Sequence, residues 1–282
     1  MNGRASWRER PFPALQQPKQ VSQRLSLGNA PTVSPVPSRS HTRRPHHPKK
    51  ESFRILPLGD SALTIEFGNV INSEINSRVV AFAKTVFNQH WQGIHDIVPT
   101  YRSVTVHFDP LRWDSATLAK RLKTLPRREP GQADPQGILH EIPVLYGGEW
   151  GPDLEAVATF AGLQPDEASA LHASIQYRVY MLGFSPGFPY LGLVPERLAM
   201  PRRSTPRTTV PAGSVGIADH QTGIYPIATP GGWQLIGRTP IAMYRKDGAD
   251  PFLLKPGNIV QFNPIDRHEF DRLSRKSLHD ND

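Results

Sequence analysis

The sequence predicts an α+β protein, in which a small N-terminal α+β domain is followed by a domain built around a β-barrel. A disordered N-terminal tail is predicted before both. Three observations support this fold class. Residues 1–50 are basic and rich in proline, and residues 53–125 alternate between strand-like and helix-like patterns. From Ser174 onward, short β-rich runs alternate with Gly and Pro turns, which is typical of a closed or nearly closed barrel.

The tail, residues 1–50, holds ten Lys or Arg residues and eight prolines against a single acid, Glu9. Such a segment cannot bury enough apolar surface to offset the entropy of ordering it. Because the tail alone carries +9 and the whole chain +8, residues 51–282 are close to neutral. We favour a dispensable tail or an over-long gene start. The alternative is a basic arm that binds nucleic acid or acidic membrane, and nucleic acid is not an expected partner.

The composition also excludes several kinds of chemistry. No apolar run of signal-peptide length follows the charges of the tail, and no apolar stretch is as long as a membrane span. The chain has no cysteine, which excludes disulfides, thiolate nucleophiles and cysteine metal sites. The eleven histidines are scattered and predict no metal site. We therefore expect a cytoplasmic protein without a membrane partner.

The first domain is predicted over residues 51–130. Two apolar runs in "FRILPLGDSALTIEFG" flank the turn residues Gly59-Asp60 and predict paired strands. A helix is predicted from about Ser73, and "RSVTVHFD" has the period-2 alternation of a half-buried strand. "DSATLAKRLKTL" predicts a second helix, with Asp114 or Ser115 as its N-cap.

The second domain is predicted over residues 136–282, after a linker at Pro126–Gly137. "ILHEIPVLY" predicts a strand. One helix is expected to begin near Pro152 and end before Gly162, and another opens at Pro165. The strands predicted beyond Ser174 are "SIQYRVYML", "SVGIA", "GIYPIA", "WQLIG", "IAMYR" and "NIVQF".

Five blocks carry a resemblance to a known family. They are "LPLGDSAL" (56–63), "GFSPGFPYLG" (183–192), "PRRSTPRTTVPAGSVGIA" (201–218), "QTGIYPIATPGGWQLIGRTP" (221–240) and "KPGNIVQFNPIDRHEF" (255–270). The chain resembles the family of the 5-oxoprolinase B subunit. That family also includes KipI-type inhibitors of a sporulation histidine kinase and the first carboxyltransferase subdomain of allophanate hydrolase and urea carboxylase.

The resemblance implies a cyclophilin-like β-barrel domain behind the small α+β domain. It also implies partners, 5-oxoprolinase subunits C and A, with which such a protein converts 5-oxo-L-proline to L-glutamate using ATP, with Mg²⁺ expected beside the nucleotide. An alternative is a KipI-type inhibitor that binds a histidine kinase without catalysis, for which Phe184, Phe188, Tyr190 and Trp233 are candidates to line an exposed groove. A carboxyltransferase partner acting with biotin is the third possibility.

Arginines are the first candidate site residues. Between Met181 and Pro240 the only acids are Glu196 and Asp219. An unpaired buried guanidinium is costly, so the arginines of this segment are either exposed or available to an anion. Arg202, Arg207 and Arg238 are predicted to bind substrate or phosphate, with a catalytic contact for Arg238, and surface solvation remains the alternative. Arg203 is expected in solvent, because adjacent extended residues point in opposite directions.

Polar residues near the arginines complete the predicted site. His172 is a candidate general base, since the family often has a histidine near this point; a satisfied structural histidine is the alternative. The family's usual "Ala-Pro" after it is replaced here by "ASIQ". Gln221 is a candidate catalytic residue, and Thr222 and Thr239 are candidate substrate or phosphate ligands. "HQTG" also reads as a hairpin turn.

"PGGWQLIGRTP" (230–240) differs by one residue from a phosphate-binding loop, G-x-x-x-x-G-K-[ST]. Its middle, "WQLI", suits a strand, its lysine is replaced by Arg238, and the following "IAMYR" alternates like another strand. A phosphate loop requires a helix at this point, so this interpretation is rejected.

Overall fold

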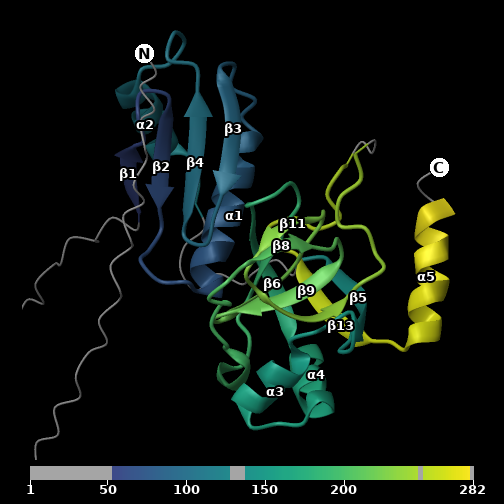
Figure 1. Cartoon of the computed structure of the whole chain (residues 1–282). Helices are drawn as coiled ribbons and strands as arrows, with labels where there is room; N and C mark the ends of the chain where they lie inside the picture. The colour runs from purple at the N-terminus through teal and green to yellow at the C-terminus, as the bar shows by residue number, and fades with distance from the viewer. Residues whose placement is uncertain (1–52, 128–136, 247–249, 280–282) are drawn as a thin grey trace, which may run out of the picture. The chain divides into compact units, whose positions relative to one another are not determined.

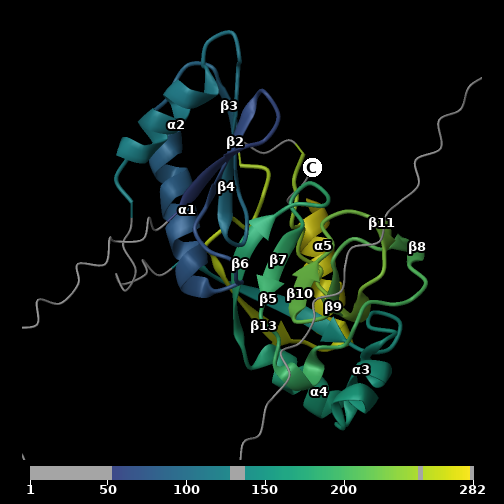
Figure 2. The same cartoon turned by 90° about the vertical axis from the view of Figure 1, so that its left-hand side faces the viewer.

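The computed structural model describes residues 53–127, 137–246 and 250–279. Its backbone contains two main sheet systems, an antiparallel sheet and a β-barrel (Figures 1 and 2). The predicted tail and most of the predicted linker lie outside the described residues. Within the described residues, no helix has both the length and the apolar character needed to cross a membrane.

The first sheet is antiparallel, with strand order β1-β2-β4-β3. Its elements, in chain order, are β1 (Arg54–Pro57), β2 (Ala62–Glu66), α1 (Ser73–Phe87), β3 (Ile94–Pro99), β4 (Ser103–Phe108) and α2 (Ser115–Thr124). The predicted pair of strands, the two helices and the half-buried strand are confirmed. The side chain of Asn72 caps α1, and that of Asp114 caps α2.

The core of this first part forms where the predicted faces meet. The alternating residues Val104, Val106 and Phe108 of β4 are buried against the apolar faces of the two helices, which include Phe82 and Leu122. The period of two in the strand and of 3.6 in the helices therefore produced a correct prediction here.

The second part is a closed barrel of seven strands, in the order β10-β7-β6-β13-β5-β12-β9. Neighbouring strands are antiparallel except β5 and β13, which run parallel. A small separate sheet pairs β8 with β11. The elements are β5 (Leu139–Tyr146), α3 (Leu154–Ala161), α4 (Pro165–Ala173), β6 (Gln176–Leu182), β7 (Pro189–Gly192), the 3-10 turn η1 (Glu196–Leu198), β8 (Arg207–Val210), β9 (Ser214–Ala218), β10 (Gln221–Ile224), β11 (Thr229–Gly231), β12 (Gln234–Arg238), β13 (Ile259–Pro264) and α5 (Arg267–His279).

Most of the barrel was predicted, and each difference has a physical reason. "IAMYR" is not a strand, because the backbone bends at Pro240 and Ile241 and only Tyr244 forms a bridge, to Phe252. Strand β3 was missed because a register shift near Asp96 breaks its alternation. Strands β7, β8 and β11 were missed as well; each is short, and β7 and β11 contain proline.

The C-terminal helix α5 was also missed. It carries few apolar residues, and ion pairs along its exposed face contribute to it, from Arg267 to Asp271 and from Arg272 to Glu269. Its side chain Phe270 lies 6.0 Å from the ring of Trp150, measured between ring centroids.

A buried asparagine connects the first sheet system to the barrel. Asn76 of α1 is fully buried; its Nδ2 donates to the carbonyl oxygens of Thr100 and Tyr180, each at 3.0 Å. Its Oδ1 accepts from Nε of Arg178 in β6 at 2.8 Å. Both sheet systems belong to one compact unit, Lys49–Asp282. The domain boundaries predicted from the sequence stay a prediction.

Candidate functional site

The structure places the predicted site residues in four separate locations. His172 and Thr222 lie inside the barrel, Gln221 lies at its surface beside Tyr101, Arg207 pairs with Asp153, and Arg238 and Thr239 line a pocket. The three predicted catalytic residues, His172, Gln221 and Arg238, are therefore not gathered around one cavity.

The location inside the barrel is a chain of hydrogen bonds through His172 of α4. Its Nε2 lies 2.9 Å from Oγ1 of Thr222, and its Nδ1 lies 2.8 Å from the hydroxyl of Tyr146. The Thr222 hydroxyl donates to the carbonyl oxygen of Gly216. Because that carbonyl can only accept, Thr222 accepts from Nε2–H, and Nδ1 accepts from the hydroxyl of Tyr146. The chain of bonds thus selects the neutral tautomer that carries its proton on Nε2.

Burial acts on the ionisation of His172 in the same direction. The side chain is fully buried, and the loss of hydration lowers its pKa from 6.5 to about 3. Burial likewise raises the pKa of Tyr146 well above its ordinary value. Both ring nitrogens of His172 are occupied by protein groups, so the geometry favours the structural alternative. A general-base role for His172 stays a prediction.

The buried histidine predicts a pH dependence of stability. Between about pH 6.5 and about pH 3, the unfolded chain binds a proton at His172 that the folded chain does not bind. The free energy of unfolding should therefore fall as the pH falls through this window, by about 1.4 kcal/mol per pH unit and about 2 kcal/mol by pH 5.

Urea unfolding at several pH values checks this expectation. His172→Gln is the matched variant, because its amide can still donate to Thr222 but does not titrate. The variant should show a flatter dependence between pH 7 and pH 5 than the unchanged protein. Equal dependence in the two proteins would contradict the assignment.

Gln221 occupies the first position of β10 and faces tyrosines. Its Nε2 donates to the hydroxyl of Tyr101, which lies in the turn between β3 and β4. The ring of Tyr101 also contacts Tyr180 and Tyr190, with centroids 5.5 and 6.1 Å apart. Burial raises the pKa of Tyr101 above its ordinary value, and the bond from Gln221 opposes this shift. The Tyr101 hydroxyl therefore stays protonated at neutral pH.

A hairpin is present at "HQTG", but its turn is Asp219-His220 and not His220 to Gly223, since Gln221 already begins β10. Strands β9 and β10 pair across the turn at Asp219-His220, with Gln221 opposite Ala218. The backbone of Gln221 is thus fixed by the sheet while its side chain reaches Tyr101.

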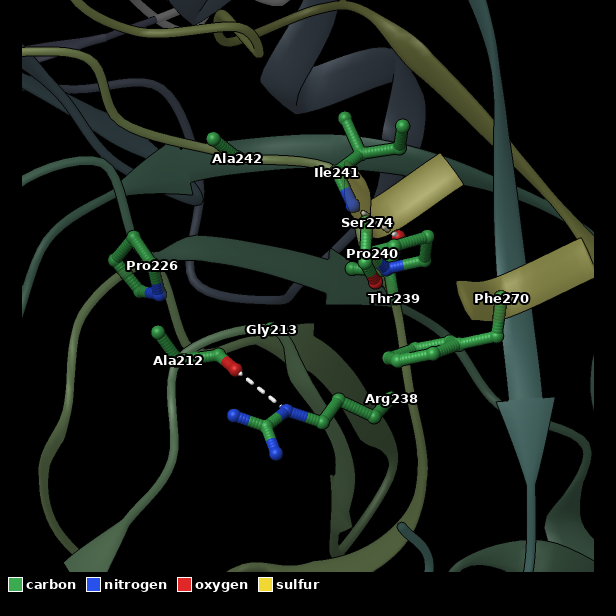
Figure 3. A pocket seen from close by; sticks show the side chains of 10 residues that line it. All are labelled: Ala212, Gly213, Pro226, Arg238, Thr239, Pro240, Ile241, Ala242, Phe270 and Ser274. Atoms are coloured by element: carbon green, nitrogen blue, oxygen red, sulfur yellow. Dashed lines mark hydrogen bonds between the residues drawn. The ribbon is translucent and has the colours of Figure 1, made fainter. Parts of the chain in front are cut away.

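Arg238 and Thr239 line a pocket of about 460 Å³ at the end of β12. We call it the Arg238 pocket; Figure 3 shows its lining, which includes Ala212, Gly213, Arg238, Thr239, Phe270 and Ser274. Nε of Arg238 donates to the carbonyl oxygen of Ala212 at 2.8 Å, which fixes the plane of the guanidinium. Partial burial lowers the pKa of Arg238, and the charge of Glu149 opposes this shift. The guanidinium stays charged at neutral pH, with two Nη groups for an anion.

The backbone at this pocket agrees with the rejection of a phosphate loop. Residues 234–238 form strand β12, and the residues that follow form no helix before Tyr244. A contact between Arg238 and an anion would therefore be made from the end of a barrel strand.

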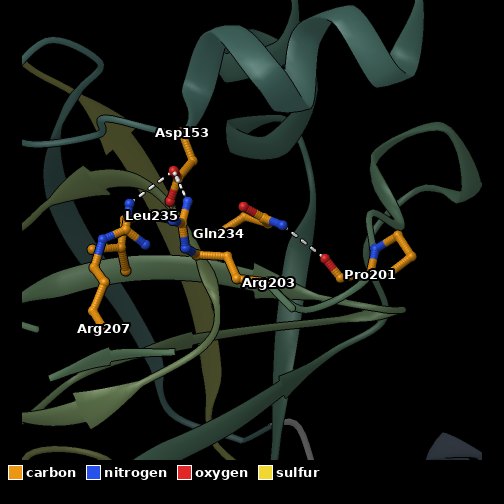
Figure 4. A network of polar contacts seen from close by, with 6 residues as sticks. All are labelled: Asp153, Pro201, Arg203, Arg207, Gln234 and Leu235. Atoms are coloured by element: carbon orange, nitrogen blue, oxygen red, sulfur yellow. Dashed lines mark hydrogen bonds and ion pairs between the residues drawn. The ribbon is translucent and has the colours of Figure 1, made fainter. Parts of the chain in front are cut away.

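Arg207 and Arg203 share one acidic partner. Both donate to Oδ1 of Asp153, from Nη2 of Arg207 at 2.8 Å and from Nη1 of Arg203 at 3.1 Å (Figure 4). Oδ2 of Asp153 accepts from the backbone N–H of Leu235 at 2.7 Å. The expectation that Arg203 is only solvated is wrong, because Asp153 precedes α3 and lies outside the acid-poor segment that holds the arginines. Arg207 takes part in this ion pair through Nη2, and its contact with substrate or phosphate stays a prediction.

The four aromatic residues predicted to line an exposed groove do not do so together. Phe188 and Trp233 are 1% and 5% exposed and belong to a second apolar cluster of the barrel, with Tyr190 packed against it. Only Phe184 is exposed, at 64%. In the segment "GFSPGFPYLG", Phe188 is thus a core side chain and Tyr190 packs against the core.

Three residues of these locations were missed from the sequence. Asp153 has a signal, since an acid after proline at a helix start is typical of an N-cap, but its side chain binds arginines instead of capping the helix. Tyr146 and Tyr101 have no local signal, because their partners are 26 and 120 residues away. The described residues contain no group of three or more His, Cys, Asp or Glu side chains that could hold a metal ion.

Comparison with known proteins identifies one family and several relatives that agree with one another. Residues 53–254 match the family described as carboxyltransferase domain, subdomain C and D. The chain is 43% identical over 239 residues to the B subunit of 5-oxoprolinase from Bacillus subtilis (strain 168), covering 80% of this chain and 98% of that protein. It is 45% identical over 210 residues to the B subunit of 5-oxoprolinase from Haemophilus influenzae, covering 74% and 97%.

Solved structures give the same fold. The crystal structure of TTHA0988 superposes with a TM-score of 0.66 at 40% identity, covering 73% of this chain and 40% of that chain. Urea carboxylase of Kluyveromyces lactis superposes with a TM-score of 0.62 at 20% identity, covering 81% of this chain and 23% of that one. The second likeness concerns the fold alone.

Proposed function

Because the chain belongs to the family of the 5-oxoprolinase B subunit, we propose that it is the B subunit of an ATP-dependent 5-oxoprolinase in the cytoplasm. In this proposal it converts 5-oxo-L-proline to L-glutamate only together with subunits C and A. One observation carries the proposal: 43% identity extends along 98% of the B. subtilis protein. Identity over nearly the whole relative favours the same role over a shared fold alone.

The Arg238 pocket is the proposed contact with substrate or phosphate in this chain. Its guanidinium is oriented by the bond to Ala212, and Thr239 adds a hydroxyl beside it. A fixed fork of N–H donors suits the carboxylate of 5-oxoproline and a phosphate of ATP equally well. Thr222 is buried in the barrel, bonded to His172, so we give it no direct contact with substrate.

The proposal divides the chemistry between the three proteins. ATP supplies the phosphoryl group that activates the lactam, and Arg238 and Thr239 are the residues of this chain proposed to meet its phosphates. The described residues contain no group of three or more carboxylate or histidine side chains for Mg²⁺, and in this proposal its protein ligands lie on a partner subunit. We therefore assign this chain the binding and orientation of an anion. Gln221, held against Tyr101, is proposed to orient a polar group of the substrate at the barrel surface.

Reconstitution tests the proposal. The purified chain, mixed with subunits C and A, is expected to form L-glutamate from 5-oxo-L-proline and ATP, measured by chromatography of the product. Mixtures that lack one of the three proteins serve as controls and should be inactive. If the complete mixture forms no glutamate, while the B. subtilis relative does so with the same partners, the proposal is wrong.

A further inference from the structure

A second groove lies at the opposite end of β12 from the Arg238 pocket. We call it the Asp153 groove; it has a volume of about 480 Å³, and its lining includes Asp153, Phe160, Arg202, Arg203, Ser204 and Gln234. Gln234 and Arg238 begin and end β12, so the two sites are separated by about 13 Å along the strand. We infer that the Asp153 groove binds a small oxyanion, a phosphate or a carboxylate, through Arg202 and Arg203.

The charges of this groove do not balance. Two guanidiniums, of Arg203 and Arg207, share the single carboxylate of Asp153. Arg202 adds a third positive charge and has no acidic partner in the described ranges; its guanidinium carbon lies 5.9 Å from the ring centroid of Trp233. Arg207 is not among the residues that line the groove, so the lining carries two positive charges, of Arg202 and Arg203, against the one negative charge of Asp153, which Arg207 already shares. An anion is therefore the ligand that this groove attracts.

The hydrogen-bond donors also outnumber the acceptors. Asp153 is 7% exposed, and both of its oxygens already accept bonds, from the two arginines and from the N–H of Leu235. Nη1 of Arg207 is buried and has no hydrogen-bond partner in the described part of the chain. Arg207 does not line the groove, so the donors offered to a ligand there are those of Arg202 and the remaining N–H groups of Arg203, for which an oxyanion supplies acceptors.

Three hydrogen-bonding contacts hold the loop that carries Arg202 and Arg203 in place. The side chain of Gln234 donates to the carbonyl oxygen of Pro201 at 2.8 Å (Figure 4). The backbone N–H of Arg203 donates to the carbonyl oxygen of Gly232 at 2.8 Å, and its side chain is bound to Asp153. A ligand therefore meets donors that are already oriented, so little ordering of the loop is required on binding.

The other residues that line the groove indicate the kind of ligand that fits it. Ser204 and Thr205 add hydroxyl groups beside the arginines, and Phe160 of α3 is 53% exposed at the rim. A lining that combines arginine and hydroxyl donors with an aromatic ring suits an anion carried by a small organic body. Arg207 acts as a positioning residue, since it donates a hydrogen bond to Asp153 but does not line the groove.

Isothermal titration of the full chain with sodium phosphate, and separately with 5-oxo-L-proline, tests this inference. We expect one or both anions to bind at low ionic strength. Arg202→Gln and Arg203→Lys should each weaken binding by about tenfold or more, because a charge or a planar fork is lost. Arg245→Gln, at an exposed arginine elsewhere, is the matched control and should leave the affinity within about twofold.

The two anions distinguish a phosphate site from a carboxylate site. Arg238→Gln is the control for the Arg238 pocket: binding that survives this change but is lost in Arg202→Gln supports the Asp153 groove. Absence of binding of both anions, or equal affinity in all variants with unchanged melting temperature, overturns the inference. The test needs only this chain, so it succeeds or fails independently of the 5-oxoprolinase assay.

Discussion

Replacing Asp153 with asparagine is expected to lower the free energy of unfolding by about 3 kcal/mol, because it removes the one acid that two arginines share. The change leaves Arg203 and Arg207 without a counter-charge, and Arg207 is only 22% exposed. We choose the lower end of the usual range because Arg203, at 37% exposure, can regain hydration. Urea unfolding of both proteins at neutral pH measures the difference.

Glu155→Gln is the matched control for this prediction. It removes the same charge from the first turn of the same helix, α3, but its carboxylate is exposed and has no ion-pair partner within the described residues. Its effect should stay below about 1 kcal/mol. If Asp153→Asn and Glu155→Gln destabilise the protein equally, the arginine pair does not depend on Asp153. Asp153 joins the start of α3 to β12 through Leu235, so its replacement should also lower the protection of the Leu235 amide from hydrogen exchange.

Arg238→Lys is expected to reduce kcat/KM of the reconstituted 5-oxoprolinase by about tenfold or more, with the fold intact. Lysine keeps the positive charge, but it cannot donate to Ala212 and at the same time present two further donors in a plane. If the contact is made equally to bound substrate and to the transition state, the loss should appear in KM. If it is made to charge that develops during the reaction, the loss should appear in kcat.

Arg245→Lys makes the same chemical change at an exposed arginine outside the Arg238 pocket. It should leave both constants unchanged. Full activity of Arg238→Lys would return Arg238 to a structural role, in which its only function is to hold Ala212 beside the end of β12. Melting temperatures of both variants separate this outcome from a loss of folded protein.

Local sequence patterns predicted the elements that bury one regular face, whether or not their partners are close in the sequence. The apolar spacing of α1 and the alternation of β4 gave those elements correctly, because each buries one face against the same core. The strands β8 and β11 were missed because they are only four and three residues long, too short to show an alternation, and α5 was missed because it carries few apolar residues.

The site illustrates the same limit. The sequence identified arginines in a segment with few acids, and Arg238 does line a pocket. The ion pair between Arg207 and Asp153 was not predicted from the sequence, because 54 residues separate the two in the chain. The sequence also could not show that His172 is enclosed by Tyr146 and Thr222 from two other elements of the barrel.

By itself the sequence determined the fold class and the residue types available for binding, because periodicity and composition depend on neighbouring residues. Its motif blocks also carried the resemblance to the family of the 5-oxoprolinase B subunit. The tertiary structure alone decided which charges are paired and which remain available to a ligand. Barrel closure brings β5, β9, β10 and β12 together from distant parts of the chain and buries His172, and Asp153, bound to Leu235 of β12, meets arginines of β8 and of the loop before it. A charge is neutralised by whatever lies near it in space, and sequence separation says little about that distance.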